Sequence, residues 1–351
     1  MTRTKPARTT MTVADHPRPA VSVILPAYDA EHTVREAVES VLRQSDVDLE
    51  LIAVDDGSTD RTLDVLSSLH DPRLLVLAGT NAGPAAARNR GIARARGDVV
   101  AFIDADDLWL PGTLRAHLET FRRIPAAAVA YCWANHVDRN GQYVCPDRRV
   151  AVEGDVYREV LAHNFIDSVS TVAIRKAALD EVGGFDESLP VIEDWDLYVR
   201  LAARHSFVCT RQVLVHYRRS PGSLTSRMLT MEATYRRVVE RAFAAAPPSL
   251  QHLKASNLAL FYEYLTTKTS QGEASRENGA MALRFFTTAV RTRPANLFSM
   301  WRRPWVLKGL VKALAWRVGG GQRPSRDSAS STIDSDAIRP DQPRPAWRRR
   351  S

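Results

Sequence analysis

The sequence predicts an α/β fold in which a mostly parallel central sheet is flanked by helices. Four short apolar runs in the first 110 residues alternate with segments whose apolar residues recur at helical spacing. Strands that alternate with helices pair in parallel through right-handed crossovers, so a single sheet is expected. The predicted strands are residues 21–25, 49–54, 74–78 and 99–103, and the predicted helices are 31–44, 60–69 and a segment through Arg88, Asn89 and Ala95.

Carboxylates gather where two of these strands end. Asp55 and Asp56 follow the second strand, and Asp104, Asp106 and Asp107 follow the fourth. Because the carboxyl ends of parallel strands share the edge where open α/β proteins bind ligands, we expect these acids in one cleft. The D-x-D spacing after the fourth strand could present oxygens to one divalent cation and leave room for phosphate. Alone it is a weak signal, since chance gives roughly one D-x-D in a chain of this length.

Beyond residue 110 the expected elements alternate less regularly. Residues 193–203 form the clearest helix, because Glu193, Asp194 and Asp196 fall in its first turn, where the helix dipole favours negative charge. Further helices are predicted over 111–121, 155–162 and 176–182, and strands over 127–133, 142–144, 170–174 and 213–217.

The pattern changes again near residue 228, where helical spacing begins to dominate. From Gly319 onward the chain is rich in Gly, Pro, Ser and Arg, a composition typical of disorder. The predicted C-terminal helices are 231–246, 253–267 and 280–290. We therefore divide the chain into a disordered basic arm (1–19), an α/β domain (20–227), a helical region (228–318) and a disordered Arg-, Pro- and Ser-rich tail (319–351).

Composition sets limits on the class of protein. The 351 residues are 44% hydrophobic, enough for a sizeable core, and the formal net charge of +8 suits nucleic acid, anionic lipid or phosphorylated ligands. Three scattered cysteines, Cys132, Cys145 and Cys209, predict neither a disulfide framework nor a structural zinc site, which fits a reducing compartment. A signal peptide and an apolar run of about 18 residues are both missing, so we expect a cytoplasmic protein.

Four motifs in order carry a resemblance to a known family. The sequence contains VSVILPAYDAE, then LELIAVDDGSTDRT, then NAGPAAARNRGIARARGDVVAFIDADD, and finally GGFDE with EDWDLYVRLA. Over about residues 20–225 it resembles the family 2 glycosyltransferases, and the order is far more specific than any one motif. The resemblance implies the GT-A nucleotide-diphospho-sugar transferase fold. It also implies an inverting enzyme that moves a sugar from a UDP- or GDP-linked donor to a hydroxyl of a glycan or lipid-linked acceptor.

For the donor nucleobase, the resemblance implies a site made by the turn Pro26, Ala27 and Tyr28 together with Asp56. Tyr28 would be the stacking face. A carboxylate at that depth can accept a hydrogen bond from a base N–H, and the wrong base would leave it unpaired. Asp55 has a different interpretation as the cap of the following helix, and Ser58 could equally be that N-cap.

For the diphosphate and the metal, the resemblance points to Arg88 and to the D-x-D acids. Arg88 would lie near the phosphates, although arginines on surface helices usually face solvent. Asp106 would ligate Mg²⁺ or Mn²⁺, which neutralises charge on the leaving group, and Asp104 would contact ribose or a metal-bound water. Asp107 could instead cap the helix that begins near Pro111.

Asp194 matches the acid of the family's E-D motif, which serves as general base. A sugar hydroxyl is a poor nucleophile near neutral pH, so a carboxylate within reach must take its proton. One base without an enzyme nucleophile implies a single displacement with inversion. Glu193 and Asp196 could simply join Asp194 in complementing the helix dipole, and Trp195 could line the acceptor pocket or belong to the core.

One departure concerns the third contact to the metal or diphosphate. Many relatives carry a histidine shortly after the Tyr-Arg of a segment like this one, but Arg219 and Ser220 occupy those places here. His216 lies on a predicted strand, where a histidine is more often a packed residue than a ligand. Arg219 could supply the positive charge directly. The acceptor side, about residues 140–225, is where relatives differ most.

A basic amphipathic helix is predicted over residues 301–318. It places Val306, Leu310, Val311 and Leu314 on one face and lysines on the other. Such a helix suits the surface of an anionic bilayer, which would place the protein at the inner face of the cell membrane, where a lipid-linked acceptor lies. A helix packed on the catalytic domain fits the same pattern.

Other classes of function fit less well. A nucleic-acid-binding module would explain the basic charge, but the arginines lie mostly in the tails and no such motif occurs between them. An inactive sugar- or nucleotide-binding relative would not need the D-x-D and Asp194. Neither a Rossmann fingerprint nor a P-loop is present to account for the acids. We therefore expect an enzyme of surface polysaccharide or glycolipid assembly in a bacterium, which does not bind nucleic acid.

Overall fold

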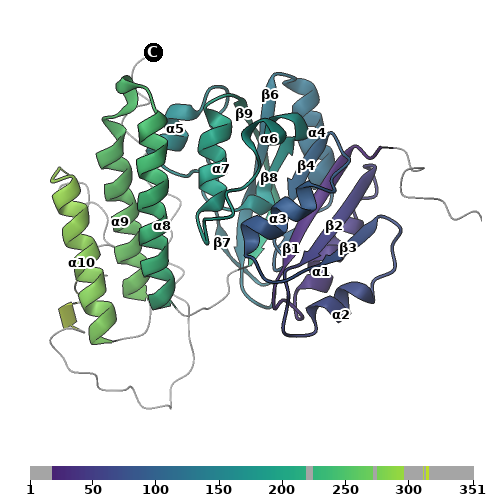
Figure 1. Cartoon of the computed structure of the whole chain (residues 1–351), viewed down its shortest axis with the longest axis horizontal. Coiled ribbons are helices and arrows are strands. Elements are labelled where there is room, and N and C mark those ends of the chain that lie inside the picture. The colour runs from purple at the N-terminus through teal and green to yellow at the C-terminus, as the bar shows by residue number, and fades with distance from the viewer. Residues whose placement is uncertain (1–17, 219–223, 272–274, 296–310, 312–313, 316–351) are drawn as a thin grey trace, which may run out of the picture.

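The computed structural model describes residues 18–218, 224–271, 275–295, 311, 314 and 315, and these form one curved sheet with helices on both faces (Figure 1). The first half of the sheet is parallel and runs in the order β3-β2-β1-β4. These strands are β1 (Val21–Ala27), β2 (Leu49–Asp55), β3 (Leu74–Ala78) and β4 (Val99–Phe102). The order brings the carboxyl ends of β2 and β4 to either side of β1, as the doubly wound pattern requires.

The second half of the sheet is mixed. β8 (Val172–Arg175) pairs antiparallel with both β4 and β6, and β9 (Ser206–Arg218) pairs parallel with β6 (Ala127–Val137). Two short strands complete it: β5 (Leu108–Trp109) pairs with β9, and β7 (Tyr143–Pro146) pairs with β6. Because β4 connects the two halves, the D-x-D loop that follows it lies at the centre of the molecule.

Helices cover both faces of the sheet, and alternate residues of each central strand face one layer or the other. In β1, Val23 and Leu25 pack with α1, whereas Ile24 packs on the opposite face with Phe102 of β4. Strands buried on both sides explain the continuous apolar runs of the sequence. The helices of this region are α1 (Val34–Leu42), α2 (Thr62–Ser67), α3 (Pro84–Ile92), α4 (Thr113–Arg123), α5 (Tyr157–Ala162), α6 (Lys176–Val182) and α7 (Glu193–Ala202).

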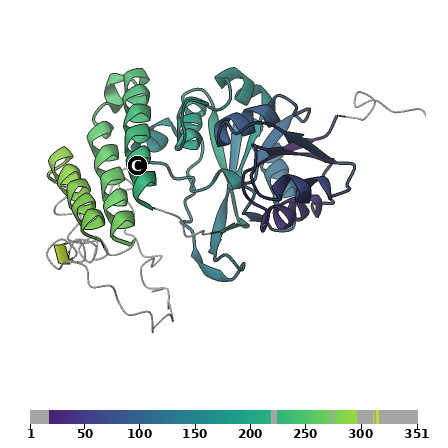
Figure 2. The same cartoon turned by 60° about the horizontal axis from the view of Figure 1, so that its bottom comes forward.

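The C-terminal helices pack against the α7 side of the sheet (Figures 1 and 2). They are α8 (Leu224–Ala245), α9 (Leu253–Gln271) and α10 (Arg276–Thr292). Their apolar residues Val238, Phe261 and Phe285 belong to the same core cluster as Trp195 of α7. The predicted boundary at residue 228 falls inside α8, and the division into domains stays a prediction.

Most element boundaries differ from the predicted ones by a few residues. Pro26 does not end β1, because the strand continues to Ala27 and Pro26 pairs with Val54. The predicted strand 213–217 is only the end of β9, and β5 was not predicted, since two residues carry no periodicity. Residues 74–78 and 176–182 agree in full. Among the described residues, no helix is both long and apolar enough to cross a membrane.

Candidate active site

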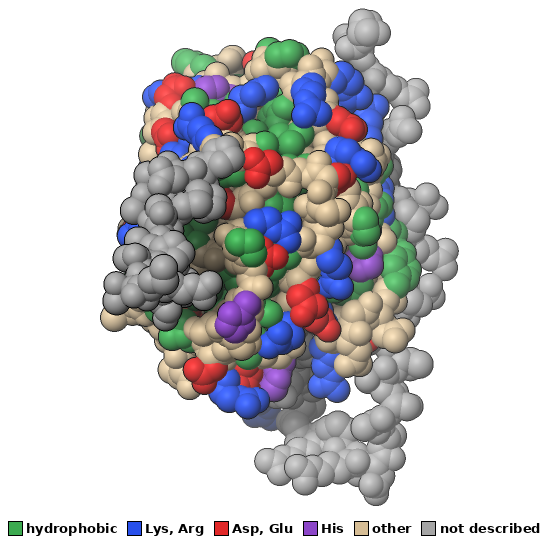
Figure 3. All heavy atoms as spheres, turned by 90° about the vertical axis from the view of Figure 1, so that its right-hand side faces the viewer, with side chains coloured by type: hydrophobic (Ala, Val, Ile, Leu, Met, Phe, Trp, Pro, Cys, Tyr) green, Lys and Arg blue, Asp and Glu red, His purple; other side chains and the backbone are tan. Residues whose placement is uncertain are grey.

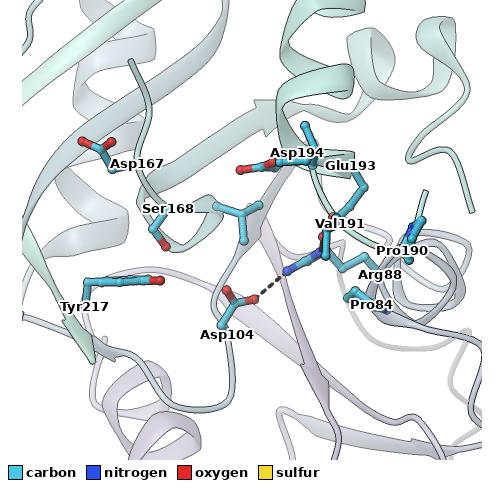
Figure 4. Close-up of a pocket in the computed structure, with 12 residues that line it drawn as sticks. Pro84, Arg88, Asp104, Asp167, Ser168, Pro190, Val191, Glu193, Asp194 and Tyr217 are labelled. Atoms are coloured by element: carbon cyan, nitrogen blue, oxygen red, sulfur yellow. Dashed lines mark hydrogen bonds and ion pairs between the residues drawn. The ribbon is translucent and has the colours of Figure 1, made fainter. Parts of the chain in front are cut away.

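An open cleft lies beyond the carboxyl end of β4, next to α3, the N-terminal turn of α7 and the segment that leads into η2 (Val169–Thr171) (Figure 4). Charged side chains from distant parts of the chain meet there: Arg88 from α3, Asp104 after β4, and Glu193 and Asp194 from α7. The other lining residues are Pro84, Asp167, Ser168, Val169, Pro190, Val191, Ile192 and Tyr217. The cleft thus brings together four of the residues that the sequence singled out.

Arg88 is the buried cation of this cleft. Its Nη2 donates to Asp104 Oδ1 at 2.7 Å, and its Nη1 donates to Glu193 Oε1 at 2.6 Å (Figure 4). Burial alone would lower the pKa of Arg88, but the charges of Asp104 and Glu193 outweigh burial and raise it. Arg88 is therefore not a solvated surface arginine. It clamps α3, the D-x-D loop and the start of α7 together.

Asp194 has the electrostatic properties of a general base. Burial, and then the charge of Glu193, raise its pKa from 3.8 to about 7, while the N–H of Trp195 and the charge of Arg88 act in the opposite direction. The Trp195 N–H donates to Asp194 Oδ1 at 2.7 Å, which fixes the carboxylate at the first turn of α7. A base whose pKa lies near the working pH is suited to proton transfer.

Ile192 holds an uncommon backbone conformation two residues before Asp194. It is the N-cap of α7 and has a φ of 67°, in the left-handed region. A β-branched residue is strained there, at a cost of about 1–3 kcal/mol, and such strain persists only where the surroundings enforce it. Ile192 also lines the cleft, so the strained position sets the direction in which α7 delivers Asp194.

Asp106 lies beside Asp104 but does not line the cleft. Burial, and then the charge of Asp104, raise the pKa of Asp106 to about 6. Its backbone carbonyl accepts a hydrogen bond at 2.8 Å from Nε of Arg218, the last residue of β9. The carboxylates of Asp104 and Asp106 repel each other, and a bound divalent cation would offset this repulsion.

Asp107 does not cap the helix after Pro111, contrary to one interpretation of the sequence. The N-cap of α4 is Gly112, and no side chain caps that helix. Asp107 is buried and accepts hydrogen bonds from Ser170 Oγ at 2.5 Å and from the Arg218 N–H at 2.9 Å. Its pKa is raised well above the usual range, chiefly by burial. Asp107 therefore ties the D-x-D loop to η2 and β9.

The acids that follow β2 have different partners from those expected. Asp55 does not cap α2, and its Oδ2 accepts instead from the Ser58 N–H at 3.3 Å. Ser58 is not the N-cap either, because its Oγ accepts from the Asp29 N–H. The N-cap of α2 is Arg61, without a side-chain cap, and Asp60 just before it accepts from the N–H of Thr62 at 2.9 Å.

Asp56 is buried and faces the loop that precedes α3. It accepts hydrogen bonds from the N–H groups of Ala82 and Gly83, at 3.1 and 2.8 Å, and forms an ion pair with Arg90. Tyr28 lies at the end of the neighbouring strand β1 and is 48% exposed, while Ala27 is buried and Pro26 is half-buried. This group lies outside the cleft residues but is joined to them through α3, which carries both Arg88 and Arg90.

Trp195 is a core residue, so the acceptor-pocket interpretation is wrong. Its side chain is 1% exposed, its Nε1 donates to the Val160 carbonyl at 2.9 Å, and its ring stacks on Tyr235 of α8 with centroids 4.7 Å apart. Glu193 does more than complement the dipole of α7, because its side chain is buried and forms an ion pair with Arg88. Asp196 is buried and paired with Arg200 and Arg241, away from the cleft.

Of the three residues considered for a third contact to a metal or diphosphate, the structure describes one, His216. His216 lies on β9, half-buried, and pairs with Leu108 and Asn135, and burial lowers its pKa. Arg219 and Ser220 lie outside the described residues. Within the part of the chain that the structure describes, no three His, Cys, Asp or Glu side chains form a metal-binding group.

The sequence did not single out three polar lining residues. Asp167 and Ser168 come from the segment before η2, and Tyr217 comes from β9 (Figure 4). Burial raises the pKa of Asp167 to about 7, opposed by the charge of Arg148. The segment NFIDSVS carries no periodicity or motif that could have marked these residues. Only the tertiary contact between η2 and the D-x-D loop brings them to the cleft.

Comparison with known proteins agrees with this geometry. The family model described as "Glycosyltransferase like family 2" matches residues 22–269. An uncharacterized glycosyltransferase of Rickettsia typhi is 28% identical over 222 residues, which span 62% of this chain and 69% of that protein. The putative teichuronic acid biosynthesis glycosyltransferase TuaG of Bacillus subtilis is 45% identical over 105 residues, spanning 29% of this chain and 42% of that protein. The chondroitin synthase of Pasteurella multocida is 29% identical over 211 residues, 57% of this chain and 21% of the synthase.

A solved structure supports the same assignment of fold. The crystal structure of S. aureus TarS, residues 1–349, superposes with a TM-score of 0.58 at 20% identity, covering 86% of this chain and 93% of that 1–349 chain. At that identity the likeness concerns the fold, and the predicted GT-A fold is confirmed. The match to the family model spans more than half of the sequence and includes every charged residue of the cleft. The chain therefore belongs to the family 2 glycosyltransferases and is a glycosyltransferase of the GT-A fold.

Proposed function

We propose that the cleft transfers a sugar from a nucleotide-diphosphate donor to a hydroxyl of a glycan or lipid-linked acceptor, with inversion at the anomeric carbon. The observation that carries this proposal is the convergence of Asp104 and Asp194 on one cleft, on either side of Arg88. The first carboxylate belongs to the donor side and the second faces the incoming alcohol. One base opposite the leaving group supports a single displacement.

The proton leaves the acceptor through Asp194. With a pKa near 7, its carboxylate is available at neutral pH and is basic enough to take the hydroxyl proton as the new bond forms. The negative charge of Glu193 raises the pKa of Asp194. Arg88, which pairs with Glu193, lowers that pKa and so limits the rise. These residues prepare the base before substrate enters, so little reorganisation is needed during transfer.

The donor is proposed to be UDP-linked. TarS, which shares the fold, has been crystallised in complex with UDP and with UDP-GlcNAc. The exposed ring of Tyr28, next to Pro26 and Ala27, offers a face on which a base can stack. Asp56 would accept from the base, which must then replace one of the loop N–H donors of Ala82 and Gly83.

Asp106 is proposed to ligate Mg²⁺ or Mn²⁺, with Asp104 beside it to contact ribose or a metal-bound water. The raised pKa of Asp106 reflects repulsion between the two carboxylates as well as burial, and this fits a cation site. When bound, the ion would neutralise the charge that builds on the leaving diphosphate. Arg88 already uses both terminal nitrogens on Asp104 and Glu193, so it orients the donor-side carboxylate and reaches the phosphates only if these bonds rearrange.

The setting is proposed to be polysaccharide or glycolipid assembly at the inner face of the membrane. TuaG and the chondroitin synthase carry names from polysaccharide synthesis. The predicted amphipathic helix 301–318 lies outside the described residues except for Val311, Leu314 and Ala315. Val311 and Leu314, both on its apolar face, are exposed. Liposome sedimentation with and without residues 301–351 tests this, and equal pelleting would remove the membrane claim.

A nucleic-acid-binding role has less support. On the face shown in Figure 3, the described Lys and Arg side chains are interspersed with carboxylates and do not gather into one basic stripe. Several described arginines are paired with acids, among them Arg61 with Glu31 and Arg73 with Asp71. Binding to a phosphate backbone relies on unpaired positive charge, which such pairing reduces.

A panel of nucleotide sugars tests the proposal most directly. The full chain is incubated with UDP- and GDP-linked sugars, with and without Mn²⁺, and release of the free nucleotide diphosphate is measured. We expect metal-dependent turnover of one UDP-sugar, which Asp106→Asn reduces and Asp194→Asn abolishes when acceptor is present. If no nucleotide is released and none binds in the presence of metal, the enzyme proposal fails.

A further inference from the structure

An unpaired hydroxyl lies next to the proposed base. Tyr198 follows Asp194 by one turn of α7, so the two side chains are on the same side of the helix. Tyr198 is among the largest fully buried side chains, and within the described structure its hydroxyl has no hydrogen-bond partner. Since buried hydroxyls are nearly always paired, such an exception calls for an explanation.

The surroundings of Tyr198 are the charged residues of the cleft. Burial and the charge of Asp194 raise its pKa well above the usual range, Arg88 opposes this, and Asp104 and Glu193 add to it. These groups come from α7, α3 and the D-x-D loop, so the phenol lies within the field of every charge that surrounds Asp194. At physiological pH the hydroxyl keeps its proton and can donate it in a hydrogen bond.

Two further observations show that this neighbourhood has unused hydrogen-bonding capacity. Arg88 Nε is buried and, among the described residues, has no acceptor. Asp194 uses Oδ1 to accept from the Trp195 N–H, and no hydrogen bond to its Oδ2 is found in the same part of the chain. Two unpaired buried donors therefore belong to residues that interact electrostatically with Asp194. A single buried water could join them, since such waters make two to four hydrogen bonds.

We propose that Tyr198 is a positioning residue whose hydroxyl donates, through one buried water that Arg88 Nε also contacts, to the ionised carboxylate of Asp194. The inference rests on the proposed function, because Tyr198 acts through Asp194 as the base. Tyr198 is not among the residues that line the cleft, so it does not touch substrate. A hydrogen bond to the charged form favours that form, so Tyr198 keeps the base ionised and fixes its direction.

The variant Tyr198→Phe tests this with little disturbance of packing, because it removes only the hydroxyl. We expect kcat to fall about tenfold and the acid limb of the kcat profile to move up by about one pH unit. The KM for the donor should stay within about twofold, since Tyr198 does not contact the nucleotide side. At a pH well below the pKa of Asp194, where the carboxyl is protonated, the melting temperature should change little, because the hydrogen bond from Tyr198 favours the ionised form.

A matched control is Tyr235→Phe. Tyr235 is also a buried tyrosine close to α7, but its hydroxyl donates to Asn257 Oδ1 at 2.9 Å and is not orphaned. Removing a hydroxyl that has a partner should lower the melting temperature and leave the acid limb where it is. Tyr198→Phe should therefore move the acid limb and leave the melting temperature at acid pH nearly unchanged, whereas Tyr235→Phe should lower the melting temperature and leave the acid limb in place.

The outcomes separate the alternatives. If Tyr198→Phe retains the kcat and the acid limb of the unaltered protein, the positioning role is wrong. A lower kcat with a lower melting temperature and an unmoved limb would make Tyr198 a purely structural residue, which also overturns the inference. Asp194→Asn shows which claim has failed. If that variant still transfers sugar, the base assignment is wrong. If it abolishes transfer while Tyr198→Phe changes nothing, only the inference about Tyr198 falls.

Discussion

Asp104 and Glu193 share one guanidinium: Arg88 donates to the former at 2.7 Å and to the latter at 2.6 Å. The carboxylate of the D-x-D loop and the residue next to the proposed base are thereby joined through a single buried cation. Breaking either contact leaves a buried charge unpaired, which is costly in a region of low dielectric. The donor side and the base are therefore one electrostatic unit.

Arg88→Lys should damage this unit although it keeps the positive charge. A single ammonium lacks the planar fork that reaches two carboxylates at once, so one of them loses its partner. We expect the free energy of unfolding to fall by about 3 kcal/mol and kcat to fall at least tenfold. Denaturant titration and steady-state kinetics check this. Arg96→Lys, at an ion pair with Glu50 remote from the cleft, is the control; if it loses as much activity, the effect is not specific.

The pH dependence of transfer should show an acid limb near pH 7. The pKa of Asp194 is about 7, so below that pH the carboxyl is protonated and cannot accept the hydroxyl proton. We expect kcat to fall about tenfold for each unit below the midpoint and to level off above it. Donor binding measured at the same pH values is the control. A kcat that stays constant down to about pH 5 would contradict the base assignment.

Asp194→Asn should make the protein more stable at alkaline pH while abolishing transfer. The pKa of this carboxyl is raised from 3.8 to about 7 on folding, so the folded state holds the proton more tightly than the unfolded chain does. The contribution of the Asp194 carboxyl to the free energy of unfolding is fully present below pH 3.8 and is lost as the pH rises through about 7.

Above pH 7 the native protein must therefore carry a partly buried charge that asparagine avoids. We expect a gain on the order of 2 kcal/mol, discounted for the side of Asp194 that is open to the cleft. The gain should shrink as the pH falls below 7, and melting curves at several pH values measure it. Equal stability of the two proteins at every pH would show that Asp194 titrates normally.

Asp106→Asn should weaken metal activation. Losing the ligating carboxylate should raise the metal concentration for half-maximal activity by about 10- to 100-fold, and nucleotide binding without metal should change little. Because protons compete for Asp106, whose pKa is about 6, the apparent metal affinity should fall as the pH drops below that value. Asp98→Asn, at an exposed carboxylate ahead of β4, serves as control. If both variants need the same metal concentration, Asp106 is not a ligand.

Much of the α/β domain could be predicted because its signals are local. β3 and α6 fall where periodicity places them, and the acids after β2 and β4 were located by the end of each apolar run. The boundaries shifted where pairing, not periodicity, decides them. Pro26 stays in β1 because Val54 of the next strand aligns with it, and the first half of β9 forms against β6.

Local patterns could not decide what each acidic side chain contacts. A cap was a fair expectation for Asp107, but it is paired with Ser170 and Arg218, residues far away in the sequence. Trp195 is adjacent to the proposed base and still points into the core, because successive helical residues face directions about 100° apart. Asp167 and Ser168 reach the cleft only through the fold of the segment before η2.

The sequence by itself determined the family, the alternation of strands and helices, and the identity of the acids at the strand ends, because these depend on order and spacing along the chain. The tertiary structure decided which acids share a cleft, which cation holds them, and that the carboxyl of Asp194 titrates near pH 7. The physical reason is that burial and the charges of distant residues set a pKa, and only folding brings Arg88, Glu193 and Asp194 within reach of one another.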